Sequence, residues 1–179
     1  MRMFVAIDLP DEIRAVIGEV VQYLRRRNLF EGTFVDPTTA HMTVAFLGDI
    51  NEDQQADIIL ALQTLEPPDY PAYLGQVDYF ERNDQVRVIF VSVICPELAT
   101  FVQRIHAVLE PWYEPDSRGF TSHVTVARVN RCHNHQELRQ KIADYHVPRT
   151  DFHISSFDLK KSELTPEGPV HKTIYGSGS

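Results

Sequence analysis

Two four-residue stretches of this chain could carry acid–base chemistry. Residues 41–44 read HMTV and residues 123–126 read HVTV, so both have the order histidine, any residue, threonine, aliphatic residue. Each stretch lies in a β-prone apolar run, and strand side chains alternate between two faces, so the histidine and threonine of each stretch face the same way. If the two strands lie side by side, two imidazoles and two hydroxyls line one cleft, as acid–base chemistry on a phosphate requires.

The four side chains divide into two chemical roles. Hydrolysis of a phosphate ester needs a base for the proton of water and an acid for the departing oxygen. The imidazoles of His41 and His123 suit either role near neutral pH, and the residues alone leave open which is which. The hydroxyls of Thr43 and Thr125 can donate hydrogen bonds to the non-bridging phosphate oxygens. Nothing in this scheme needs a metal, so we expect neither a metal nor a cofactor.

A structural interpretation competes with the functional one. The chain has eight histidines, and a single histidine in a strand is usually only a satisfied polar residue. The two histidines are separated by 123 − 41 = 82 residues, which is nearly half of the 179. This spacing indicates an approximate internal duplication that places the two stretches on related strands of two lobes, and it favours the functional interpretation.

Phe46 and Arg128 each follow a motif histidine by five positions. Arg128 is a candidate fixed positive charge for the phosphate, although strict alternation would turn it to the wrong face unless a bulge or the strand end brings it round. A surface ion pair is its structural alternative. Phe46 could stack on a nucleobase, but core packing is the interpretation that the apolar run favours.

Composition and charge limit the partners and the compartment. The chain is 43% hydrophobic and 23% charged, which is typical of one globular domain, and its net charge is −8. An acidic protein is a poor candidate for a long polynucleotide groove, which leaves a small phosphate site or a nucleic-acid end as the open alternatives. The N-terminal apolar run is too short for a signal peptide, and no stretch approaches the length of a membrane span. Two cysteines without CxxC spacing fit a reduced compartment, so we expect a cytoplasmic protein without a disulfide framework.

Hydrophobic periodicity predicts one domain with alternating helices and strands. We expect residues 1–175 to form this domain and residues 176–179 (GSGS) to be a flexible tail. The predicted helices span about 10–27, 51–65, 96–112 and 135–145, and the predicted strands lie near 3–9, 41–47, 70–80, 86–94, 122–129, 152–159 and 170–175.

Further stretches carry a family resemblance. They are 4–10 (FVAIDLP), 45–48 (AFLG), 127–128 (AR), 159–164 (LKKSEL) and 168–169 (GP). With the two histidine motifs, the chain resembles the two-histidine phosphoesterase superfamily over nearly its whole length. The resemblance is closest to the LigT-like RNA 2',3'-cyclic phosphodiesterases, which are also named 2'-5' RNA ligases. One departure is His171, where the family commonly has tyrosine.

The resemblance implies an α+β fold with two pseudo-symmetric lobes, each a mainly antiparallel sheet with outer helices, and an active cleft between them. It implies that His41 is the proton donor, that His123 is the proton acceptor, and that an arginine at position 128 belongs to the site. The implied reaction is hydrolysis of RNA or nucleotide 2',3'-cyclic phosphates to 2'-phosphomonoesters without ATP or metal, with reversible 2'-5' ligation as a second capacity. We also expect a monomer.

Two alternatives stay open from the residues. A metal-dependent hydrolase could use Cys132, His133 and His135, because a His-x-His pair on a strand can seat a transition metal, although no matching motif recurs elsewhere. A catalytically idle RNA or nucleotide binding module of the same fold is the other alternative. The intact histidines and threonines of both motifs speak against that module.

Overall fold

The computed structural model describes residues 1–115, 119–165 and 168–178. Its strands are β1 (Arg2–Asp8), β2 (Phe30–Phe34), β3 (His41–Asp49), β4 (Tyr70–Arg82), β5 (Gln85–Ile94), β6 (His123–Cys132), β7 (Asp151–Ile154), β8 (Asp158–Thr165) and β9 (Gly168–Gly176). Its helices are α1 (Asp11–Arg27), α2 (Glu52–Leu62), α3 (Leu98–Leu109) and α4 (His135–Ala143), with a short 3-10 helix, η1 (Pro37–Thr39).

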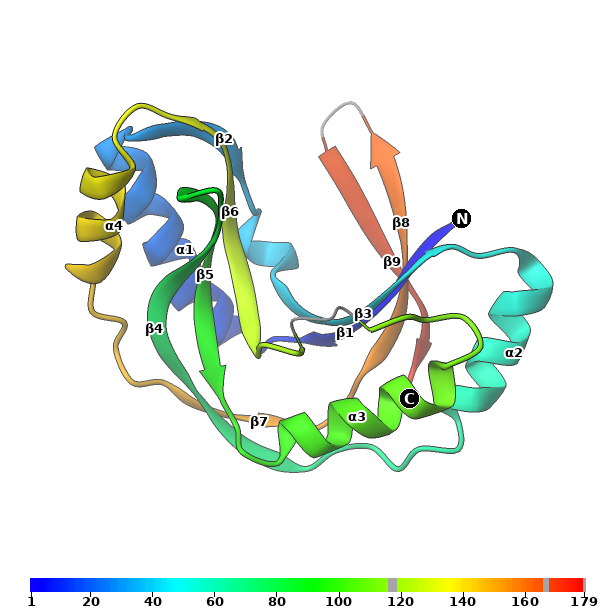
Figure 1. Cartoon of the computed structure of the whole chain (residues 1–179). Helices are drawn as coiled ribbons and strands as arrows, with labels where there is room; N and C mark the ends of the chain where they lie inside the picture. Colours follow the sequence, from blue (N-terminus) through cyan, green and yellow to red (C-terminus); the bar gives the residue numbers. More distant parts are fainter. Residues whose placement is uncertain (116–118, 166–167, 179) are drawn as a thin grey trace.

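The strands form two separate antiparallel sheets. The first sheet has the order β3-β1-β8-β9 and the second has the order β2-β6-β5-β4-β7. Figure 1 shows α2 and α3 on the outside of the four-stranded sheet, and α1 and α4 on the outside of the five-stranded sheet. The expected α+β fold with two lobes is therefore confirmed. None of the helices in the described ranges is long and apolar enough to cross a membrane.

The lobes do not correspond to the two halves of the chain. Helix α1 follows β1 in the sequence but packs in the other lobe, where the Tyr23 hydroxyl donates a hydrogen bond of 2.8 Å to the carbonyl oxygen of Lys141 in α4. Helix α3 follows β5 and crosses in the opposite direction, so that the Phe101 ring lies 5.6 Å from the ring of Phe157, just before β8. Helices α1 and α3 therefore each pack in the lobe opposite to that of the strand that precedes them (Figure 1).

Local sequence signals explain where the helices begin and end. The buried face of α1 consists of Ile13, Ile17, Val20, Val21 and Leu24, which fall at helical spacing. Three arginines, residues 25–27, occupy its last turn, where the helix dipole favours cations, and Asn28 closes it with a left-handed backbone at φ 49°. Helix α2 begins with a capping box, in which Asn51 and Gln54 exchange side-chain to backbone hydrogen bonds.

Three details differ from the sequence prediction. Strand β2 was not predicted, because its sequence FEGTF buries only Phe30 and has no alternating apolar pattern. The predicted strand at 152–159 is two strands, β7 and β8, which belong to different sheets. The expected tail boundary at residue 175 is also too early. Strand β9 continues to Gly176, and the backbone N–H and side-chain oxygen of Ser177 both bond to the backbone of Phe157.

Gly32 gives a test of the pairing between β2 and β6. A Cβ atom added there would lie 2.1 Å from the carbonyl oxygen of Arg128, which is backbone and has no room to yield. We expect Gly32→Ala to push β2 away from β6 and to lower the free energy of unfolding by about 1–3 kcal/mol, as overpacking does. Urea unfolding followed by circular dichroism measures this loss.

Gly18→Ala is the matched control. Its added Cβ would meet only Pro37, at an ordinary contact distance of 3.5 Å, and it sits within α1. A glycine inside a helix is less favourable than alanine by roughly 0.5–1 kcal/mol, so this variant should be at least as stable as the parent chain. A Gly32→Ala variant with unchanged stability would contradict the described β2–β6 pairing.

Candidate functional site

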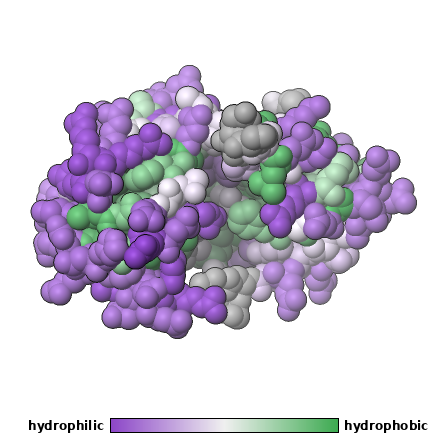
Figure 2. Space-filling model, turned by 90° about the horizontal axis from the view of Figure 1, so that it is seen from above, coloured by the Kyte–Doolittle hydropathy of each residue, from purple (hydrophilic) through white to green (hydrophobic). Residues whose placement is uncertain are grey.

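The two motif strands meet across the lobes. Strand β3 belongs to the four-stranded sheet and β6 to the five-stranded sheet, and the two strands contact each other. The Ser122 hydroxyl, next to His123, donates a hydrogen bond of 3.2 Å to the sulfur of Met42, next to His41. The structure therefore brings the two histidine motifs together. Figure 2, seen from above, shows the molecular surface hollowed between the two lobes.

Both motif strands carry a β-bulge at the same motif position. In β3, Val44 has no partner in β1, because the register passes from Thr43 directly to Ala45. In β6, Val126 is skipped in the same way against β5. A bulged residue interrupts the alternation of side chains, so Val44 and Ala45 are both buried. The next residue, Phe46 in β3 and Arg128 in β6, then lies on the same face as the histidine.

The bulges decide the positions of Phe46 and Arg128. The side chain of Phe46 is 65% exposed, so the core-packing interpretation of this residue is wrong. The ring of Phe4 contacts both Phe46, at 5.9 Å, and His41, at 5.1 Å, which shows that all three lie on one face. Arg128 is exposed at the equivalent place on β6, and its charge lowers the pKa of His123. The bulge thus removes the objection that strict alternation raised against Arg128.

Both imidazoles are held by the same kind of hydrogen bond. Nδ1 of His41 lies 2.9 Å from the carbonyl oxygen of Thr39, and Nδ1 of His123 lies 2.7 Å from that of Thr121. A carbonyl oxygen only accepts, so Nδ1 must carry the hydrogen in each ring. In the neutral form Nε2 then keeps a free lone pair, so both histidines offer the same nitrogen for proton transfer.

Aromatic rings enclose each imidazole on two sides. His41 lies between Phe4 and His171, with centroid distances of 5.1 Å to both. His123 lies between Phe90 and Phe80, again at 5.1 Å to both. These rings displace water from the imidazoles, which penalises the charged form.

Burial is the largest influence on the protonation of both histidines. It lowers the pKa of His41 and of His123 below the ordinary value of 6.5, and the hydrogen bonds to the carbonyls of residues 39 and 121 oppose this shift. Around His41, Asp8 raises the pKa, whereas Lys160 and Arg14 lower it. The site therefore favours neutral imidazoles.

Sequence reasoning missed a buried charge network beside His41. Lys160 in β8 is only 7% exposed, and its Nζ lies 2.8 Å from Asp8, 3.0 Å from the Thr173 hydroxyl and 3.3 Å from Asp158. Asp8 is also the register partner of His41 in the β1–β3 ladder. The signal in the sequence is a lysine within the β-prone stretch LKKSEL, where a buried strand position would ordinarily be apolar.

The residues proposed for a metal site do not assemble into one. His135 begins α4, and its Nδ1 accepts a hydrogen bond of 3.2 Å from the backbone N–H of Val86. The Cys132 thiol donates to the carbonyl oxygen of Leu29 at 3.4 Å. Within the described parts of the chain, no group of three or more histidine, cysteine or acidic side chains could hold a metal ion.

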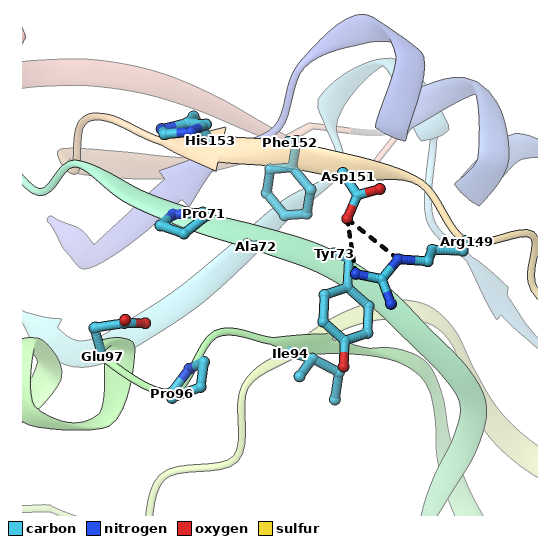
Figure 3. Close-up of a pocket in the computed structure, with 10 residues that line it drawn as sticks. All are labelled: Pro71, Ala72, Tyr73, Ile94, Pro96, Glu97, Arg149, Asp151, Phe152 and His153. Atoms are coloured by element: carbon cyan, nitrogen blue, oxygen red, sulfur yellow. Dashed lines mark hydrogen bonds and ion pairs between the residues drawn. The ribbon is translucent and has the colours of Figure 1, made fainter.

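A separate hollow of about 450 Å³ lies beside β4 and β7 (Figure 3). Arg149 closes one side of it, stacked at 4.0 Å on the Tyr73 ring and paired at 3.1 Å with Asp151. None of the predicted site residues lines this hollow. It therefore has no part in the chemistry of the two histidines.

Known proteins match this chain in sequence and in fold. The family model described as LigT like Phosphoesterase matches residues 7–90. A Methanocaldococcus jannaschii protein named RNA 2',3'-cyclic phosphodiesterase is 27% identical over 175 residues, which cover 97% of this chain and 98% of that protein.

Two solved structures share the fold over almost their full length. The Thermus thermophilus protein TT0787 superposes with a TM-score of 0.79 at 24% identity, covering 98% of this chain and 96% of that one. Escherichia coli LigT complexed with 3'-AMP gives a TM-score of 0.74 at 20% identity, with coverages of 98% and 95%. Sequence match, full-length relatives and shared fold agree, and the chain is similar to the LigT-like phosphoesterases along nearly its whole length.

Proposed function

We propose that this protein hydrolyses 2',3'-cyclic phosphates of nucleotides or RNA ends to 2'-phosphomonoesters, without a metal. The observation that carries the proposal is the pair of imidazoles on touching strands, each with Nδ1 bonded to a backbone carbonyl and Nε2 left for proton transfer. The name RNA 2',3'-cyclic phosphodiesterase of the curated relative supports the reaction. The nucleotide 3'-AMP bound to the E. coli structure supports the substrate class.

The proposed mechanism divides the two proton transfers between the lobes. His123 takes a proton from water as it attacks phosphorus, and His41 gives a proton to the departing 3' oxygen. The resemblance assigns these roles, and the reverse, ligating reaction would exchange them. Positioned proton transfers of this kind are worth roughly 10²- to 10⁴-fold in rate.

The remaining site residues would hold the phosphate and the base. The hydroxyls of Thr43 and Thr125 share the faces of their histidines, where they can donate to the non-bridging oxygens as negative charge grows. Arg128 supplies a fixed positive charge beside His123, and the exposed Phe46 ring offers a stacking surface for a nucleobase. The net charge of −8 favours RNA ends and nucleotides over long RNA as substrates, and we propose that the protein acts as a monomer.

Removing either imidazole tests the pair. We expect His41→Ala and His123→Ala each to lower turnover of a 2',3'-cyclic nucleotide by roughly 10²-fold or more, because each variant loses one proton transfer. The double variant should lose much less than the product of the two single losses, because the residues act as a unit. Steady-state kinetics of the three variants measures both effects.

His153→Ala is the control for these variants. His153 is an exposed histidine whose Nδ1 lies 3.0 Å from Asp69, in the hollow of Figure 3 and outside the site. It should keep the turnover of the parent chain. Parent-like turnover in either His41→Ala or His123→Ala would refute the proposed pair.

The pH dependence of kcat/KM tests the protonation states. The active enzyme needs one protonated and one neutral imidazole, which gives a bell-shaped profile. Burial lowers the pKa of both histidines, so the maximum should lie below 6.5 and activity should fall as the acid loses its proton at higher pH. Measurement from about pH 4 to about pH 9 covers both limbs. A profile that rises from neutral to alkaline pH would rule out the proposed protonation states.

The product identifies which ribose oxygen leaves. Two histidines alone do not choose between the 2' and 3' oxygens, because the outcome depends on which oxygen lies in line with the attacking water and next to the acid. We expect only the 2'-phosphomonoester, formed in excess EDTA and without ATP. Chromatography against authentic 2'- and 3'-phosphates decides the point. A 3'-phosphate product would be compatible with the two-histidine mechanism but would refute the proposed release of the 3' oxygen. Loss of activity in EDTA would refute the proposal that the reaction needs no metal.

A further inference from the structure

A third histidine lies against the catalytic pair. His171 in β9 has its ring centroid 5.1 Å from that of His41, with the ring planes at 87°. It also contacts the Phe4 ring at 5.0 Å, so Phe4, His41 and His171 form one cluster. The proposed mechanism gives His171 no task.

The other lobe shows that packing alone does not call for a histidine at this place. There, the Phe80 ring lies 5.1 Å from His123, with the ring planes at 88°. The distance and angle are almost the same as those between His171 and His41. A phenylalanine therefore satisfies the packing requirement, and what the imidazole adds is its two ring nitrogens.

The surroundings of these nitrogens fix the state of the ring. Nδ1 of His171 is buried and has no hydrogen-bond partner among the described residues. A buried N–H without an acceptor is costly, so the hydrogen of the neutral ring belongs on Nε2. Burial, His41 and Lys160 lower the pKa of His171, and Asp8 opposes them. Burial and the two neighbouring charged or chargeable groups therefore favour the neutral form of His171.

We propose that His171 contacts the substrate and donates a hydrogen bond from Nε2 to a non-bridging oxygen of the phosphate. With no acceptor at Nδ1, the Nε2–H group is the donor that the neutral ring can offer to a ligand. A neutral donor beside His41 adds no charge that would oppose protonation of that ring. The inference rests on the proposed phosphodiesterase function and adds a residue to its site.

Two substitutions separate hydrogen bonding from packing. His171→Phe copies the ring that the other lobe uses and removes the donor, so we expect kcat/KM to fall by about 10- to 100-fold, as for a lost hydrogen bond to a charged group. His171→Gln keeps an N–H donor and should lose clearly less. Lys172→Ala, the exposed neighbour in β9, is the control and should keep parent activity. Parent-like kcat/KM in His171→Phe, or equal losses in the Phe and Gln variants, would overturn the proposal.

NMR of ¹⁵N-histidine-labelled protein gives a readout that does not depend on activity. At neutral pH the His171 ring should appear as the Nε2–H tautomer, and its ¹⁵N signals should shift when inorganic phosphate is added. An Nδ1–H tautomer, or signals that ignore phosphate, would overturn the proposal even where the Phe variant fails to fold. If the parent chain turns over no cyclic nucleotide, the proposed function fails, and the phosphate titration still decides whether His171 binds the anion.

Discussion

The β-bulge in each motif strand is the constraint on which the site depends. In a regular strand Ala45 and Ala127 would face the histidine side, and Phe46 and Arg128 would face the core. The bulges at Val44 and Val126 let two consecutive side chains enter the core and return the next residue to the histidine face. Each strand thereby carries three side chains toward the cleft in six residues. The core gains packing at the same point, because both residues of the bulged pair are buried.

Aromatic enclosure and fixed charges act against each other around His41. The rings of Phe4 and His171 exclude water and favour the neutral imidazole, whereas Asp8 favours the charged one. Lys160 limits that effect, because its ammonium group is bonded to Asp8 at 2.8 Å and partly neutralises it. Around His123 no carboxylate of the described residues contributes, and Arg128 adds to the effect of burial. The two lobes thus share a geometry but differ in charge.

Much of the site was predictable because its signals are local. The repeated histidine and threonine motifs, the helical spacing of α1 and the caps of α2 can each be read within a few residues. The bulges could not be predicted, because a one-residue change of register leaves no mark in a continuous apolar run such as TVAFL. Phe46 was misassigned to the core for this reason. His171 and Lys160 were not predicted as site residues, because β8 and β9 reach His41 only through strand pairing across more than a hundred residues.

The exchanged helices have a consequence for how the cleft can move. The chain passes from one lobe to the other between β1 and α1, β2 and β3, α2 and β4, β5 and α3, α3 and β6, and β7 and β8. Two domains that are joined by a single linker can open by a hinge motion about that linker. In this protein, a change in the separation of the lobes would require all of these connecting segments to change conformation together. The repeated crossings of the chain therefore restrict how far the two motif strands can separate, in addition to the contacts between the lobes.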